Sequence, residues 1–277
     1  MCKVLNVNES GYYKKIRNKQ KVSKKAILSV EIQAILREDE ENANYGVNRM
    51  LTALKQRNIS VSKRTVYRAM SEMGLIHTRR VPHGITKATT EIQERENLIK
   101  RDFTAQKPME KCLCDITEIQ TSEGKLYISA ILDCFDGAII GLQIRDNMRK
   151  ELCIDTVKTA FNKNGNGVIL HSDRGSQYTS AEYKKILAKM NIVQSLSGAG
   201  HCFDNARMES FFATLKKELL YQIPTYKMKK ENVQSRIYRY IFGYYNTRRI
   251  NSFNPDGLPP IVYKNLYYSK NKEKSVA

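Results

Sequence analysis

The hydrophobic period of the chain changes at residue 111, and the order of elements after that point limits the folds that it can adopt. Three strand-like runs follow one another: CLCDITEI, KLYISAILDC and GAIIGLQI. Because only EGK and FDG separate them, these runs predict an antiparallel meander. Helices and strands are then expected in alternation: RKELCIDTVKTAF, GVILHSD, SAEYKKILAKM, NIVQSL and ARMESFFATLKKELL.

This β-β-β-α-β-α-β-α order predicts an α/β protein with a mixed five-stranded sheet and flanking helices, the ribonuclease-H-like fold. In that fold the first and fourth strands are neighbours. Asp115 within the first strand and Asp173 at the end of the fourth are therefore expected to lie close together. Glu209 lies beside the packing stripe of the last helix, on one line with Lys216, and is expected to face the same sheet edge.

Three clustered carboxylates repel one another and need cations to stay ionised together. Hard oxygen ligands select Mg²⁺ or Mn²⁺, and two such ions about 4 Å apart support phosphoryl transfer. Taken singly, an aspartate after a strand is usually a turn residue, and a glutamate in the first turn of a helix complements the helix dipole. Lys216 either contacts a phosphate or is an exposed helix lysine. We expect Asp133 and Asp136, near strand ends, to be structural.

The chain carries 47 lysine and arginine residues against 28 acidic ones, a formal net charge of +19. Such an excess indicates a polyanionic partner, usually nucleic acid, although a solvated basic surface or an acidic protein partner would also explain it. No window approaches about 18 consecutive apolar residues, so no membrane span is expected. MCKVLNVNESGYYKK contains no apolar core of signal-peptide length, so we expect a cytoplasmic, nucleoid-associated protein. The six cysteines form no CxxC pair, which favours reduced, buried thiols over a zinc site.

The first part of the chain shows helical periodicity. Apolar residues at roughly helical spacing predict a helix over residues 24–39: Ile27, Val30, Ala34 and Ile35. A second helix after Gly46 is predicted by four apolar residues at i, i+3, i+4 and i+7: Val47, Met50, Leu51 and Leu54. Ser62 is placed to cap a third helix, SKRTVYRAMSEMGL, which Gly74 ends.

The second and third of these helices form a helix-turn-helix candidate. The third helix begins with Lys63 and Arg64 and continues to Arg68, so that its basic end would enter a DNA major groove. An ordinary helical hairpin with a charged outer face is the alternative. We expect four segments: a helix-turn-helix domain, a basic linker with a short helix around Glu91–Arg101, a catalytic domain and a basic tail, over residues 1–76, 77–104, 105–265 and 266–277.

The blocks around the three acids resemble the DDE transposases of the insertion-sequence-three family, relatives of retroviral integrases. Asp173 and Glu209 are separated by 35 residues, the third spacing of that family. HSDRGSQYTS and CFDNARMESFFATLKKE resemble the blocks around its second aspartate and its glutamate, and DITEI resembles the block after its first aspartate. YYNTRRIN with PDGLPPIVY resembles its C-terminal signature, and YGVNRMLTALKQRNISVSKRTVYRAMSEMGL its helix-turn-helix segment.

The resemblance implies that Asp115, Asp173 and Glu209 are the metal-binding catalytic triad. It implies hydrolysis of a phosphodiester at the element's end, followed by attack of the freed 3′-hydroxyl on another DNA strand. Double-stranded DNA, as element ends and target, is then the substrate, and joining two ends requires at least a dimer. Arg248 and Arg249 in the C-terminal signature would bind DNA or cap a helix end. Many relatives work as fusions with an upstream reading frame, so its product is an expected partner.

Two other functions compete with a transposase. A non-catalytic DNA-binding regulator derived from a transposase would keep the helix-turn-helix, but the intact triad blocks favour the enzyme. A ribonuclease-H-like nuclease acting on RNA–DNA hybrids would share the fold. The helix-turn-helix and the long basic C-terminal region count against that alternative.

Overall fold

The computed structural model describes residues 8–13, 24–76, 97–162, 165–198 and 202–276. The chain divides into two compact units, Met1–Arg80 and Val81–Ala277. No helix in these described ranges is long and apolar enough to cross a membrane. Each unit is built around its own set of buried apolar side chains.

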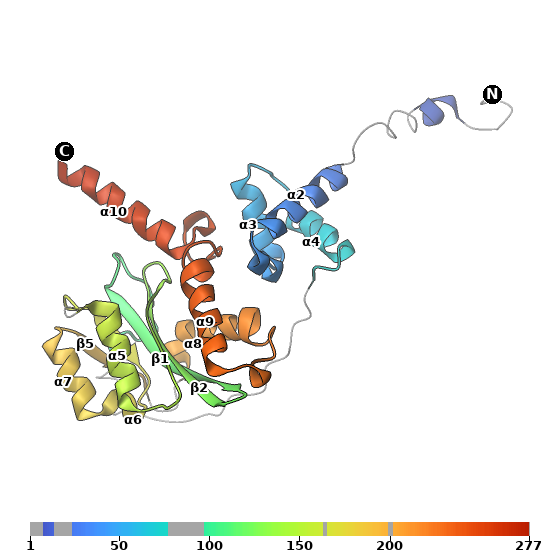
Figure 1. The fold of residues 1–277 in the computed structure, drawn as a ribbon. Coiled ribbons are helices and arrows are strands. Elements are labelled where there is room, and N and C mark those ends of the chain that lie inside the picture. The colour runs from blue at the N-terminus through green and yellow to red at the C-terminus, as the bar shows by residue number, and fades with distance from the viewer. Residues whose placement is uncertain (1–7, 14–23, 77–96, 163–164, 199–201, 277) are drawn as a thin grey trace. The chain divides into compact units, whose positions relative to one another are not determined.

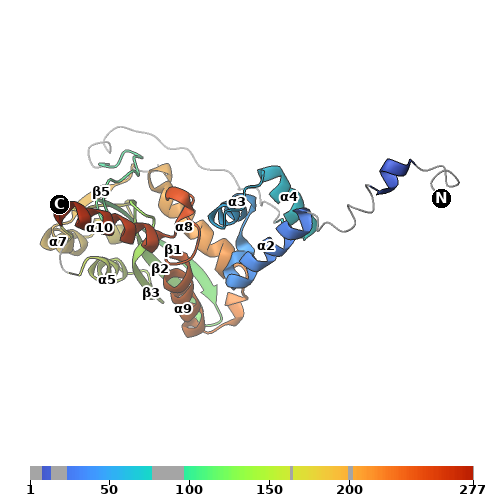
Figure 2. The ribbon, with the colours of Figure 1, turned by 90° about the horizontal axis from the view of Figure 1, so that it is seen from above.

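The first unit is a cluster of helices, drawn in blue to cyan in Figures 1 and 2. Its elements are α2 (Lys24–Glu38), the 3₁₀ turn Glu40–Asn44, α3 (Val47–Gln56) and α4 (Lys63–Glu72). Met50 and Leu54 of α3 and Val66 of α4 are fully buried, as the helical spacing predicted. Ser62 caps α4, its hydroxyl accepting a hydrogen bond from the Thr65 amide at 3.2 Å. The predicted pair of helices joined by a tight turn is confirmed.

The helix predicted over residues 24–39 is present as α2, but two of the apolar residues that indicated it lie outside its buried face. Ile27 and Val30 are 52% and 63% exposed. The buried stripe is instead Leu28, Ile32 and Ile35, at i, i+4 and i+7. The helix carries apolar residues on two overlapping stripes, and the position of α3 and α4 decides which stripe is covered.

The second unit contains the predicted mixed sheet. Its strands are β1 (Lys111–Thr121), β2 (Gly124–Asp133), β3 (Ile139–Arg145), β4 (Ile169–Ser172) and β5 (Val193–Leu196), in the order β3-β2-β1-β4-β5. The first three strands form the antiparallel meander, while β4 runs parallel to β1 and β5 parallel to β4. The expected contact between the first and fourth strands is therefore confirmed.

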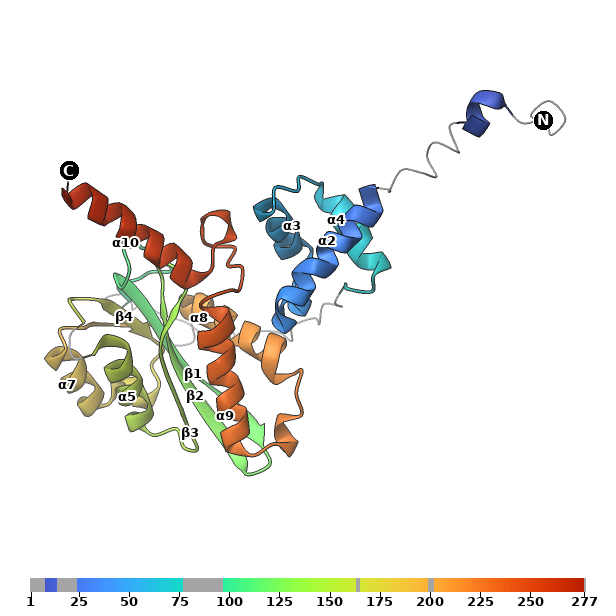
Figure 3. The same cartoon turned by 45° about the horizontal axis from the view of Figure 1, so that its top comes forward.

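Helices cover both faces of the sheet, and Figures 1 and 3 show α5 and α7 on one side and α8 and α9 on the other. Their bounds are α5 (Lys150–Phe161), α6 (Ser176–Thr179), α7 (Ala181–Lys189), α8 (Ala206–Leu215) and α9 (Lys230–Tyr238). The core under α5 and α7 includes Cys112, Cys114 and Cys153. These thiols are free and buried, in agreement with the expected reduced cysteines.

Two helices continue as π-helical turns, Lys216–Leu220 after α8 and Arg239–Tyr245 after α9. The remaining elements are the 3₁₀ turns Cys202–Asn205, Thr225–Lys227 and Pro255–Gly257 and the last helix, α10 (Pro260–Val276). Residue 265, the predicted end of the catalytic domain, lies inside α10.

The start of α10 is fixed to the turn between β2 and β3. The ring of Tyr263 stacks on Phe135 at a centroid distance of 4.9 Å. The Lys264 ammonium lies 3.3 Å from a carboxylate oxygen of Asp133 and 3.2 Å from one of Asp136, both fully buried. Asp133 and Asp136 therefore have the structural role expected of them.

The helix predicted over Glu91–Arg101 lies largely outside the described residues, which exclude 77–96. Its last part, residues 97–101, consists of bends and turns instead. Lys100 and Arg101 have φ angles of 49° and 64°, and the left-handed region is incompatible with a continuing right-handed helix. For these residues the prediction was wrong.

Candidate functional site

Asp115 lies on β1, and Asp173 directly follows β4, the parallel strand that pairs with β1. In the register of β1 and β4, Leu113 pairs with His171. Asp115 and Asp173 each follow two residues later, and a spacing of two keeps a side chain on the same face of a strand. The sheet therefore brings the two carboxylates to one edge position.

Asp173 is the first residue after β4 and is exposed. One of its carboxylate oxygens accepts a hydrogen bond from the Gly175 amide at 2.9 Å. This hydrogen bond holds the short turn that follows the strand.

Glu209 lies in the first turn of α8, and two side chains near the start of that helix tie it to the sheet. The Asn205 amide donates to the Cys114 carbonyl at 3.2 Å, directly before Asp115. The Arg207 guanidinium donates to the Cys134 carbonyl at 2.5 Å, at the end of β2. The helix start is thus held across β1 and β2, which places Glu209 over the first aspartate.

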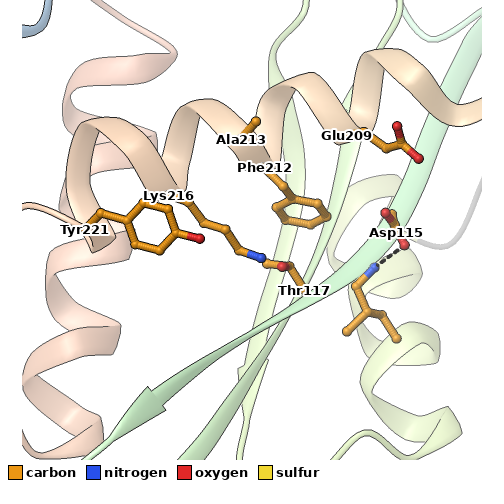
Figure 4. A pocket seen from close by; sticks show the side chains of 8 residues that line it. Asp115, Thr117, Glu209, Phe212, Ala213, Lys216 and Tyr221 are labelled. Atoms are coloured by element: carbon orange, nitrogen blue, oxygen red, sulfur yellow. Dashed lines mark hydrogen bonds between the residues drawn. The ribbon is translucent and has the colours of Figure 1, made fainter. Parts of the chain in front are cut away.

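Asp115 and Glu209 line one open pocket of about 390 Å³ between β1 and α8, shown in Figure 4. The other lining residues are Ile116, Thr117, Phe212, Ala213, Lys216 and Tyr221. Figure 4 shows the two carboxylates on the same side of this pocket, with the Lys216 side chain and the Tyr221 ring farther along α8. Asp173 is not among the lining residues, but its charge acts on Asp115.

Burial and nearby negative charges change the pKa values of the acids in the pocket. The pKa of Asp115 is raised to about 7, chiefly by burial and also by the charges of Asp173 and Glu209, while a hydrogen bond from the Ile116 amide and the nearby Lys216 oppose the rise. Burial also raises the pKa of Glu209. Within the described parts of the chain, no group of three His, Cys, Asp or Glu side chains is placed so that it could hold a metal ion.

Asp115→Asn is expected to stabilise the protein at alkaline pH in the presence of a chelator. Because the folded-state pKa of Asp115 lies above its unfolded value, the wild type loses stability as pH rises from about 4 to about 7. The neutral amide removes that loss, a gain on the order of 2 kcal/mol above pH 7 after allowance for partial exposure. Urea unfolding at pH 4 and pH 8 measures it, and an equal difference between the two proteins at both pH values would contradict this explanation.

The basic residues predicted to contact DNA have different surroundings. Lys63, Arg64 and Arg68 are exposed on α4. Lys216 lines the pocket beside the acids. Arg248 is exposed on the second unit.

Arg249 is a correction to the predicted set. Its side chain is only 8% exposed, and its guanidinium donates two hydrogen bonds of 2.9 Å to the carboxylate of Glu218. It also lies 5.3 Å from the centre of the Tyr245 ring. Arg249 is therefore part of the core and has no surface to offer a phosphate. Neither of the sequence-based roles, DNA contact or helix cap, anticipated this buried ion pair.

Two pocket residues were missed by the sequence reasoning. Thr117 lies two residues after Asp115 on β1, and the strand period of two was a signal that placed it on the same face. Tyr221 had no such signal, because it follows the end of α8 and reaches the pocket only through the π-helical turn.

Comparisons with known proteins show similarity in both units of the chain. Two models described as "Integrase core domain" match residues 105–202 and 209–267, and a model described as "HTH-like domain" matches residues 22–83. Among solved structures, the HTLV-2 integrase catalytic core domain in complex with magnesium has a TM-score of 0.44 and 17% identity, covering 58% of this chain and 99% of that one.

Named relatives match along almost the whole chain. Transposase InsF for insertion sequence IS3A of Escherichia coli (strain K12) is 31% identical over 273 residues, covering 96% of this chain and 93% of the relative. The transposase for insertion sequence element IS904 of Lactococcus lactis subsp. lactis (strain IL1403) is 35% identical over 240 residues, covering 85% of this chain and 92% of the relative. With its ribonuclease-H-like sheet, its helix-turn-helix unit and these relatives, the chain belongs to the IS3 family of DDE transposases.

Proposed function

We propose that this transposase hydrolyses a phosphodiester bond at each end of its element and then joins the freed 3′-hydroxyl to a target strand. Asp115, Asp173 and Glu209 are the catalytic triad in this proposal. The observation that supports it is that Asp115 of β1 and Glu209 of α8 line one pocket, where the charge of Asp173 also acts on Asp115. The pKa of Asp115 is raised to about 7, mainly by burial and also by these two neighbouring charges, and perturbed acids of this kind are typical of functional sites.

The donor set fits divalent metal ions. Three carboxylates supply hard oxygen ligands and excess negative charge, which select Mg²⁺ or Mn²⁺. A pair of such ions, when bound, would activate the attacking oxygen and stabilise the leaving one. The chain's own contribution is to hold Asp115 on a rigid strand, Glu209 on an anchored helix and Asp173 in a hydrogen-bonded turn.

The basic side chains hold the substrate in this proposal. Lys216 lies in the pocket, where it would contact the phosphate next to the one that reacts. The exposed Lys63, Arg64 and Arg68 of α4 and Arg248 of the second unit bind double-stranded DNA at the element ends and the target. Joining two ends requires at least two copies of the chain on DNA, and an upstream-frame product would be a further partner. The protein would act on the nucleoid in the cytoplasm.

A strand-transfer assay tests this function. Labelled duplexes that end in the element's terminal inverted repeat are incubated with the protein and Mg²⁺, and the products are separated by length. Shortened strands and strands joined to target DNA are expected, and neither is expected with a chelator. Binding without either product would indicate the non-catalytic regulator, and cutting confined to RNA–DNA hybrids would indicate the ribonuclease.

Replacing Lys63, Arg64 and Arg68 together with alanine is expected to weaken binding to the inverted repeat about 10- to 100-fold at moderate salt. Each basic contact to phosphate contributes nearly one unit to the salt dependence, so the slope of log K against log[salt] should fall by roughly 2 to 3. Fluorescence anisotropy over a salt series measures both quantities. The matched control replaces Lys184, Lys185 and Lys189 of α7, and an equal loss in that control would contradict a specific role for α4.

A further inference from the structure

Tyr221 is the most exposed aromatic side chain among those lining the pocket, with 62% of its surface accessible. Figure 4 shows its ring beside the Lys216 side chain, on the same side of α8 as the two carboxylates. Single exposed aromatic rings are common on protein surfaces. What sets Tyr221 apart is that it lines the same pocket as Asp115, Glu209 and Lys216.

The π-helical turn puts the ring there. In a continuing α-helix, five residues after Lys216 would place Tyr221 about 140° away around the helix axis. Instead the Tyr221 amide donates to the Lys216 carbonyl at 2.8 Å, the i to i+5 bond of a π turn. This wider turn brings Tyr221 closer to the face of the helix that carries Lys216. Glu209, seven residues before Lys216, lies on the same face.

Buried contacts hold this turn in place. Glu218, in the middle of it, is paired with Arg249 and accepts a hydrogen bond of 2.7 Å from the Tyr240 hydroxyl. Leu219 and Leu220 are buried on its inner side. The geometry that presents Tyr221 is thus part of the core of the second unit.

Along α8 the pocket offers three chemistries in sequence: carboxylates at Asp115 and Glu209, a cation at Lys216 and an aromatic face at Tyr221. In a nucleotide, the base is joined to the phosphate through one sugar. A phosphate held by the Lys216 cation would therefore bring its base near the Tyr221 ring. An exposed aromatic ring next to a phosphate-binding cation is a stacking platform for a base that has left the duplex.

We propose that Tyr221 stacks on an unpaired base at the end of the bound DNA, beside the phosphate held by Lys216. This inference rests on the proposed function, because it takes DNA as the occupant of the pocket. Stacking would hold a frayed end open and keep the strand to be cut next to the acids.

The test uses a random-sequence duplex with a short unpaired 3′ overhang that contains 2-aminopurine, because stacking tolerates any base. All proteins carry Asp173→Asn, so that no chemistry interferes. Stacking quenches 2-aminopurine fluorescence. Tyr221→Ala is expected to abolish the quenching and to weaken binding to this duplex roughly 5- to 150-fold, with a smaller change for a fully paired duplex. Tyr221→Trp and Tyr221→Phe should preserve both.

Tyr226 provides the matched control, because it is 61% exposed and lies outside the pocket. Tyr226→Ala should leave the quenching unchanged. Quenching that persists in Tyr221→Ala, or that is lost equally in Tyr221→Phe, would overturn the proposal, since the second result would indicate a hydroxyl contact. Failure of the proposed function has a different signature, namely strand transfer that survives Asp173→Asn, so the two failures are distinguishable.

Discussion

Asp173→Asn is expected to reduce both hydrolysis and strand transfer by on the order of 10³-fold or more. Asparagine removes one negative charge from the group of acids that Asp115 senses electrostatically. Charge stabilisation at a metal site contributes several kcal/mol to the transition state, and each 1.4 kcal/mol corresponds to about tenfold in rate. The fold should be preserved, because the asparagine carbonyl can still accept the hydrogen bond from the Gly175 amide.

The measurement is the initial rate of product formation from labelled element ends at saturating Mg²⁺. Asp146→Asn is the matched control, since Asp146 is an exposed acid of the same unit that lies outside the pocket. It should keep the wild-type rate. Residues that act as a unit are non-additive, so adding Glu209→Gln to Asp173→Asn should cause little further loss. An Asp173→Asn protein that retains the wild-type rate would refute the triad.

Arg249→Met is expected to lower the free energy of unfolding of the second unit by about 3–5 kcal/mol. Glu218 and Arg249 have only 6% and 8% of their side chains exposed, so the variant leaves a carboxylate buried without its cation. For a unit of this size the melting temperature should fall by about 10 °C. The same variant should disturb the π-helical turn that presents Lys216 and Tyr221.

Two control variants test whether the loss of stability comes from the buried ion pair. Arg248→Ala, at the exposed neighbouring position, should change the free energy of unfolding by about 0.5 kcal/mol or less. Adding Glu218→Gln to Arg249→Met should recover part of the loss, because a neutral amide is less costly to bury than a charge. Equal stability of Arg249→Met and Arg248→Ala would show that the buried ion pair contributes nothing to the stability of this unit.

The sheet and its two aspartates were predictable because they depend on local periods. Strand and helix spacing in the sequence identified all five strands and the helices between them. Asp115 and Asp173 were expected together because the first and fourth strands are neighbours in the ribonuclease-H-like fold, and the structure shows that these two strands pair. Glu209 and Lys216 followed from the seven-residue spacing along α8.

Other features depend on contacts between residues far apart in the sequence. Arg249 looked like a surface cation, and only the approach of Glu218, 31 residues earlier, makes its burial favourable. The buried stripe of α2 is chosen by the helices that pack on it, since its own sequence offers two. Tyr221 joins the pocket because a π-helical turn, held by the same Glu218, adds residues to one turn of the helix.

The sequence by itself therefore determined the order of the elements and pointed to the three candidate acids, because helix and strand periodicity are properties of neighbouring residues. The tertiary structure alone decided the strand register, which charges are buried in pairs and which exposed aromatic ring lines the pocket. Burial of a charge is favourable only when a distant partner compensates its lost hydration, and that compensation exists only after the chain has folded.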